Sequence, residues 1–219
     1  LEFGTDTIDL RAGDLKGLTV LGTGEVVVNQ EQADVDFRVE SDSDAYALFV
    51  KASTSRVGIG TSSPEYELEV KASTDASINI RAGTSSGDFA GVYFGDTDYP
   101  AEGRITYQNS DNKMRFWSDR QHVMTLDDNK RVGIGTESPG DYSAYADDLV
   151  VAGAGETGIT IASGNSSQSG LYFSDGTSGT EQYIGYLDYN HSSNALIIGT
   201  GGAEKFRITE QGTIGMGPG

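Results

Sequence analysis

The sequence contains no cysteine, only 2 histidines and 4 prolines, and no long apolar run. The absence of cysteine excludes disulfide bonds and thiolate metal centres, and two isolated histidines argue against a zinc site within one chain. Because no stretch reaches the roughly 18 apolar residues of a membrane helix, we predict no membrane insertion. Basic residues are also few: 15 stand against 33 acidic ones, and the net charge of −18 argues against nucleic acid as a partner.

Apolar side chains are scarce as well. Hydrophobic residues make up 36% of the 219 residues, while 30 residues are glycine. A single chain of this composition has a thin core, and thin cores are usually reinforced by disulfides, metals or oligomerisation. With disulfides excluded, the composition favours metals or oligomerisation.

What the sequence does contain is a series of short alternating runs, whereas helical periodicity is missing. Alternation of apolar and polar residues predicts strands with one buried face. The clearest pairs of alternating apolar residues are Phe37/Val39, Leu68/Val70, Ile78/Ile80, Ile159/Ile161 and Phe206/Ile208. Clusters of turn-forming residues separate the runs, so we predict an all-β fold.

The chain also repeats itself. SRVGIGTSSP at 55–64 returns as KRVGIGTESP at 130–139, and the last residues, GTIGMGPG, resemble both. Self-similarity over this length predicts an array of similar units. We predict a segment at 1–24 that includes a cloning junction, a short β module at 25–64, and repeat units at 65–139 and 140–219, and we expect the chain to be part of a longer protein.

Glycine alternates with β-branched residues in VGIG, and proline follows closely in both decamers. Glycine within a strand marks a place where another backbone comes close, and proline forces a turn or an edge. We interpret each copy as a structural corner between modules, with its glycines against a symmetry-related chain. A phosphate cradle is the alternative, but a strand rather than a helix follows. The corner residues are Gly58, Gly60, Pro64, Gly133, Gly135, Pro139, Gly215 and Gly217.

The string of motifs is similar to a known family. Residues 24–64, followed by GVYFGD, GRITYQNSDNKMRFWS and RVGIGTESP, resemble the repetitive shaft and receptor-binding modules of tail-fibre proteins from tailed bacteriophages, the marine type especially. The resemblance covers nearly all of 24–219. In the last copy of the decamer, Met216 and Pro218 depart from the earlier residues.

This resemblance implies an elongated homotrimeric fibre of short-strand modules, built either as an intertwined β-helix or β-prism or as stacked β-sandwiches. It also implies a structural role in the virion, after assembly in the host cytoplasm. The implied partners are other phage tail proteins and a glycan or protein receptor on the bacterial surface.

Two groups of side chains are candidates for binding. The aromatic residues Trp117, Tyr93, Tyr99 and Tyr172 are candidates for stacking on a glycan. Alternation in VYF and RFW predicts one member of each pair in the core and its neighbour exposed. The acidic residues Asp96, Asp98 and Asp175 are weak candidates for calcium. No calcium-binding loop motif is complete, so we predict no cofactor and keep calcium as the alternative.

Paired carboxylates also occur in glycosidases, but here no histidine or arginine is placed beside them in sequence. We therefore predict a structural and attachment protein without enzymatic activity. Three alternatives remain open: a glycan-binding tip module, a polysaccharide-cleaving tailspike, and a secreted calcium-dependent adhesin.

Overall fold

The computed structural model describes residues 2–3, 7–12, 15–21, 23, 25–28 and 34–217. The described elements are strands and three short 3-10 helices, so the predicted all-β class is confirmed. The chain divides into two units, Leu1–Arg81 and Ala82–Gly219, each of which is described by itself. The expected boundaries at residues 24, 64 and 139 remain predictions.

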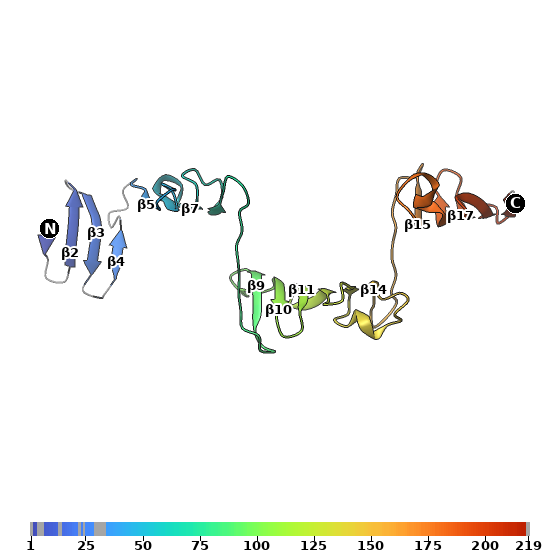
Figure 1. Cartoon of the computed structure of the whole chain (residues 1–219), viewed down its shortest axis with the longest axis horizontal. Coiled ribbons are helices and arrows are strands. Elements are labelled where there is room, and N and C mark those ends of the chain that lie inside the picture. The colour runs from blue at the N-terminus through green and yellow to red at the C-terminus, as the bar shows by residue number, and fades with distance from the viewer. Residues whose placement is uncertain are drawn as a thin grey trace. The chain divides into compact units, whose positions relative to one another are not determined.

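Unit 1 contains two four-stranded sheets (Figure 1). The first follows the order β1-β2-β3-β4 and consists of β1 (Glu2–Phe3), β2 (Thr7–Ala12), β3 (Leu15–Leu21) and β4 (Val26–Val28). The second follows the order β5-β6-β7-β8 and consists of β5 (Phe37–Val39), β6 (Leu48–Lys51), β7 (Arg56–Ile59) and β8 (Leu68–Val70), with the 3-10 helix η1 (Ala52–Thr54) between β6 and β7. All of its neighbours are antiparallel except β7 and β8, which are parallel.

Unit 2 contains two antiparallel meanders. The first meander consists of β9 (Phe89–Phe94), β10 (Gly103–Gln108), β11 (Lys113–Ser118), β12 (Gln121–Leu126) and β13 (Val132–Ile134). After the 3-10 helix η2 (Pro139–Asp141), β14 (Leu149–Val151) joins β13 in parallel. The second meander consists of β15 (Gln168–Phe173), β16 (Gly185–Asn190), β17 (Ala195–Thr200), β18 (Ala203–Ile208) and β19 (Ile214–Met216), with η3 (Gly179–Tyr183) before β16.

The two meanders share their pairing in detail. In each, five strands follow one another in sequence order, and each strand pairs with the next. The register shifts between Phe116 and Trp117 in the first meander, and between Ile198 and Gly199 in the second. These bulges lie at matching positions of β11 and β17, and a β-bulge re-aims the side chains next to it.

The glycines of the two decamers have a local structural explanation. Gly60 and Gly135 both adopt a positive φ, of 75° and 74°. A Cβ at Gly60 would clash with the carbonyl oxygen of Lys71, and one at Gly135 with that of Ala152. The same sequence therefore recurs because the chain makes the same crossing twice, from β7 to β8 and from β13 to β14.

These close approaches differ from the expected contact with a symmetry-related chain. Gly58 and Gly133 likewise face the carbonyl oxygens of Thr61 and Thr136 of their own turns. Contacts within one chain are therefore sufficient to require glycine in both decamers, while Pro64 and Pro139 are buried beside the turns. In the third copy, Gly217 faces the carbonyl of Glu204 and Gly215 faces open space, whereas Pro218 lies outside the described residues.

Two of the expected strands are not formed. The runs that contain Ile78 and Ile80, and Ile159 and Ile161, form no regular secondary structure and pair with no strand among the described residues. All four side chains are exposed. The prediction was wrong because alternation describes the residues of a single segment only. A strand also needs a neighbouring strand for its hydrogen bonds, and within the described residues none lies beside these runs.

Candidate functional site

Each meander is a single sheet with one apolar and one polar face. Side chains alternate between the faces along a strand, and directly opposite residues share a face, so the strand register assigns every side chain. In the first meander one face carries Val92, Phe94, Ile105, Tyr107, Met114, Phe116, Met124, Leu126, Val132 and Ile134. In the second it carries Leu171, Phe173, Leu187, Tyr189, Leu196, Ile198, Phe206, Ile208, Ile214 and Met216.

These apolar faces lie at the surface. Phe94 is 56% exposed and Phe173, at the equivalent position, is 64% exposed. The residues buried in the meanders lie on the opposite faces instead, as with Thr125, which is fully buried, and Ile197. Burial is therefore inverted relative to an ordinary one-sided sheet, in which the apolar face is covered.

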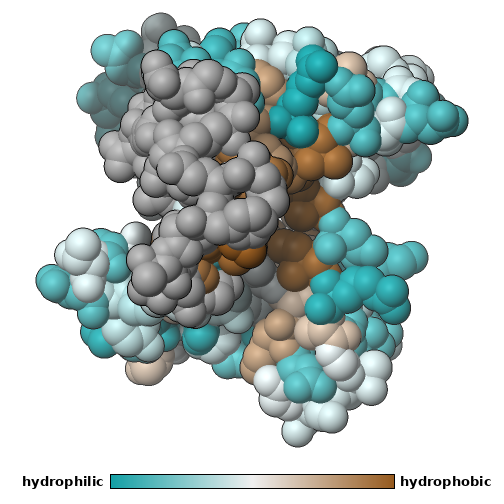
Figure 2. Space-filling model, turned by 90° about the vertical axis from the view of Figure 1, so that its left-hand side faces the viewer, coloured by the Kyte–Doolittle hydropathy of each residue, from teal (hydrophilic) through white to brown (hydrophobic). Residues whose placement is uncertain are grey.

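The sheets of unit 1 repeat this arrangement. In the β5–β8 sheet, one face consists of Phe37, Val39, Leu48, Val50, Val57, Ile59, Leu68 and Val70. In the β1–β4 sheet, one face carries Ile8, Leu10, Leu18, Val20, Val26 and Val28. Many of these side chains are exposed, and Figure 2 shows apolar side chains at the molecular surface. Every sheet of the chain thus has an apolar face without a layer over it among the described residues.

The prediction that VYF has one buried residue next to an exposed one is wrong. Val92, Tyr93 and Phe94 are all exposed, at 46%, 49% and 56%. Alternation does place Tyr93 on the face opposite to Val92 and Phe94. It does not bury either face, because no second layer among the described residues covers the end of β9.

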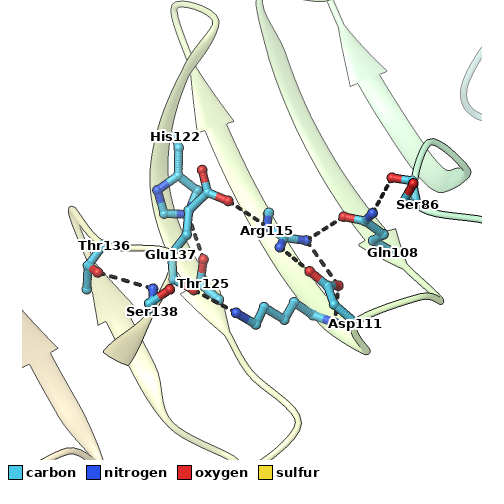
Figure 3. Close-up of polar contacts among 10 residues, drawn as sticks. Ser86, Gln108, Asp111, Arg115, His122, Thr125, Thr136, Glu137 and Ser138 are labelled. Atoms are coloured by element: carbon cyan, nitrogen blue, oxygen red, sulfur yellow. Dashed lines mark hydrogen bonds and ion pairs between the residues drawn. The ribbon is translucent and has the colours of Figure 1, made fainter. Parts of the chain in front are cut away.

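The polar face of the first meander is filled by arginine. Arg115 on β11 is 6% exposed, and its guanidinium donates to Gln108, to the carboxylate of Asp111, and from Nε to Glu137 at 3.1 Å (Figure 3). Burial opposes ionisation of Asp111, but hydrogen bonding to Arg115 and its positive charge outweigh burial, so the pKa of Asp111 is lowered. This buried cation therefore has two carboxylate partners.

A second arginine occupies the same face. The guanidinium of Arg104 lies over the Trp117 ring at 4.1 Å from its centroid, and His122 packs edge-on against that ring at 5.5 Å. Trp117 is consequently half-buried, and its ring is held between Arg104 and His122.

The second histidine, His191, lies after β16 in the second meander and contacts the Ser169 hydroxyl through Nε2 at 3.1 Å.

At the corresponding place, the second meander has a hollow. Its volume is about 370 Å³, and its lining consists of Gln168, Tyr172, Tyr183, Tyr186, Asp188, Asn190, Ile197, Gly202, Glu204 and Arg207. The pairing of the two meanders makes Tyr186 equivalent to Arg104, Ile197 to Arg115 and Gly199 to Trp117. Two of these three positions carry smaller side chains in the second meander, Ile197 and Gly199, while the Tyr186 ring lies over Gly199.

Of the charged side chains that line the hollow, Arg207 and Glu204 form an ion pair, whereas Asp188 is not part of one among the described residues. Arg207 holds Glu204 through two hydrogen bonds of 2.8 and 2.6 Å, and this contact lowers the pKa of Glu204. Asp188 is only 4% exposed, and among the described residues its carboxylate accepts a hydrogen bond from the Tyr172 hydroxyl alone, at 2.9 Å. Burial, followed by this bond to Asp188, raises the pKa of Tyr172. Asp188 is therefore a buried carboxylate with no ion pair among the described residues.

Of the aromatic residues expected to contact glycans, only Tyr172 lies in the hollow. Trp117 is held between Arg104 and His122, and Tyr99 is exposed with the guanidinium of Arg120 5.1 Å from its ring centroid. The residues of the hollow that sequence reasoning missed include Asp188 and Tyr186. Their alternate positions in YLDYN were the available signal, but without the register it did not identify the strands beside them.

The acidic candidates lie on exposed loops. Asp96 accepts the backbone amides of Asp98 and Tyr99, both at 2.9 Å, and these bonds lower its pKa. Asp98 and Asp175 are also exposed. Among the side chains that the structure describes, no three of the types histidine, cysteine, aspartate and glutamate are grouped as metal ligands.

Comparison with models of known protein families finds no match, and comparison with curated protein sequences finds no significant one. In the described part of the chain, no helix has the length and apolar character needed to cross a membrane.

Proposed function

We propose that the chain is a non-enzymatic structural segment of a bacteriophage tail fibre, which assembles as a homotrimer and presents or forms the region that attaches to a bacterial surface. The single observation that carries the proposal is the exposed apolar face on every sheet. Monomeric proteins rarely leave large contiguous apolar patches in water. Three copies related by a threefold axis would cover these faces with one another and leave the polar faces outward.

The unpaired runs at 77–82 and 158–163 fit an intertwined assembly. Each carries two isoleucines at alternate positions, forms no regular secondary structure and pairs with no strand among the described residues. A neighbouring copy would supply the missing hydrogen-bond partners and complete a β-ladder. The resemblance to phage tail-fibre modules supplies the biological setting: a virion protein, with other tail proteins and a bacterial surface receptor as partners.

The catalytic alternative receives less support. A glycosidase needs one carboxyl group that is held protonated to act as general acid. In the loop expected to hold paired carboxylates, backbone amides lower the pKa of Asp96, so this side chain is not suited to act as the general acid.

Cross-linking tests which face is the interface. Because the chain has no cysteine, Phe94→Cys and Tyr93→Cys each introduce a single thiol, at neighbouring positions on opposite faces of β9. We expect a short bifunctional maleimide to give covalent dimers with Phe94→Cys and little product with Tyr93→Cys. Equal yields from the two variants would contradict the proposed interface.

Small-angle X-ray scattering then tests the fibre itself. A fibre segment predicts a trimer with a rod-like distance distribution. A trimer with the distribution of a compact sphere would retain the interface but contradict the fibre.

A further inference from the structure

The hollow of the second meander differs from its counterpart in the first by the loss of positive charge. In the first meander, the polar face holds the guanidinium groups of Arg104 and Arg115 beside Trp117. At the equivalent positions of the second, Tyr186, Ile197 and Gly199 bring no charge. Asp188 takes the place of the buried Thr106 and adds a negative charge. Arg207 takes the place of Thr125 and adds a positive charge, which is paired with Glu204.

Among the buried charged residues of the two meanders, Asp188 is unusual because it has no ion pair among the described residues. Buried charges in proteins are normally paired or bound to metal, and an exception calls for an explanation. The buried Arg115 has Asp111 and Glu137, and the buried Asp127 has Arg131 at 2.7 Å. In the part of the chain that the structure describes, the only hydrogen-bond partner of the Asp188 carboxylate is the Tyr172 hydroxyl. Arg207 is the only cationic residue among the described residues that line the hollow, and its guanidinium already makes two hydrogen bonds to Glu204.

The remaining lining suits an organic cation. Tyr172, Tyr183 and Tyr186 contribute three rings, and the centroids of Tyr172 and Tyr186 lie 6.3 Å apart with the rings tilted by 36°. The faces of aromatic rings attract ammonium groups, most strongly where water is excluded. A volume of about 370 Å³ accommodates a small molecule. The chain's net charge of −18 favours the approach of cations.

We propose that the hollow on the polar face of β15–β18 binds the alkylammonium group of a small molecule, with Asp188 as its counter-ion and the tyrosine rings around it. The ligand restores the positive charge that Arg104 and Arg115 supply in the first meander. Since the hollow lies on the face opposite to the apolar one, it stays open when the apolar faces pair. The site belongs to one chain, so it is tested separately from the trimer.

The experiment is a calorimetric titration of the whole chain with tetramethylammonium chloride and with butylammonium chloride, at constant ionic strength set by sodium chloride. We expect saturable, millimolar binding of at least one of the two. Methyl β-galactoside is the neutral probe and is expected not to bind. No saturable binding of either ammonium ion, or binding of the galactoside alone, would overturn the proposal.

Variants locate the binding. Asp188→Asn removes the counter-ion and should weaken binding by about tenfold or more. Tyr186→Arg introduces the guanidinium that Arg104 provides in the first meander and should abolish binding by occupying the site. Tyr93→Phe, in the first meander at the position equivalent to Tyr172, is the control and should bind as the unaltered chain does.

Circular dichroism and molar mass identify the variants that keep the native state. If Asp188→Asn does not fold, Tyr186→Arg decides the question, because the equivalent arginine is accommodated in the same sheet geometry. Unchanged binding by natively folded Tyr186→Arg would show that the ammonium ion binds elsewhere and would refute the assignment.

Discussion

The two meanders of unit 2 are alike on one face and unlike on the other. Both have the same strand pairing and a bulge at the same place, and both carry large apolar residues at ten equivalent positions of one face. On the polar face, Arg104, Arg115 and Trp117 of the first meander give way to Tyr186, Ile197 and Gly199 in the second. The comparison suggests that the apolar face serves one common purpose, which we take to be assembly, while the polar face is free to differ.

The largest effect is expected from substitutions on the apolar face that the two meanders share. Ile105→Asp and the equivalent Leu187→Asp place a charge on the apolar face, where the proposed trimer would bury it in every chain at a cost of several kcal/mol. We expect both variants to dissociate or unfold, measured by light scattering and circular dichroism.

Tyr93→Asp is the matched control, because Tyr93 is more exposed in the chain than Ile105 but lies on the polar face. It should remain assembled. Assembled, stable Ile105→Asp and Leu187→Asp would show that the apolar face is not an interface.

The next largest effect concerns the crossings that the decamers form. Gly135→Ala places a Cβ at a positive φ and against the carbonyl of Ala152. We expect it to lower the free energy of unfolding by at least about 2 kcal/mol, because both strain and a steric clash contribute. Gly60→Ala should behave in the same way. Gly155→Ala, with open space around it, should change stability little. Chemical denaturation measures all three, and equal effects would refute the explanation of the decamers.

A smaller effect is expected from removing Arg115, the buried arginine on the polar face of the first meander. Arg115→Ala leaves Asp111 and Glu137 without their buried partner and should cost about 2–3 kcal/mol, less than for a fully buried pair because both carboxylates retain some exposure. Arg38→Ala is the comparison, since Arg38 and Glu40 form an ion pair with both side chains about half exposed. Its cost should stay below about 1 kcal/mol. A loss for Arg115→Ala no larger than that for Arg38→Ala would contradict the assigned network.

Acid should produce the smallest and most graded effect. The pKa values of Asp111 and Asp127 are lowered, because bonds to Arg115 and to Arg131 outweigh the opposing effect of burial. A lowered folded-state pKa contributes stability above the unfolded value, about 3.9 for aspartate, and this stability is lost as pH falls through the folded pKa. Thermal unfolding should therefore shift to lower temperature below about pH 4.

Asp127→Asn should flatten this acid dependence, because it removes one of the titrating groups. An unchanged profile in that variant would indicate that other carboxylates cause the acid sensitivity.

The sequence predicted part of this structure and missed part of it for physical reasons. Alternation at Phe37/Val39 and Phe206/Ile208 predicted strands that form. The same alternation at Ile78/Ile80 did not, because a strand also needs a neighbour, and the pattern within one segment contains no information about one. Tyr172 was found as an aromatic candidate, but Asp188 beside it depends on the register of β15 with β16. That register is a long-range property of the fold.

The central claim is that the apolar faces are covered by other copies of the chain, and molar mass in solution tests it most directly. Light scattering on the purified chain, with and without a chelator, should give three times the 23.2 kDa of one chain in both conditions. A folded particle of 23.2 kDa would contradict the claim, because its apolar faces would then be stable in water without a partner.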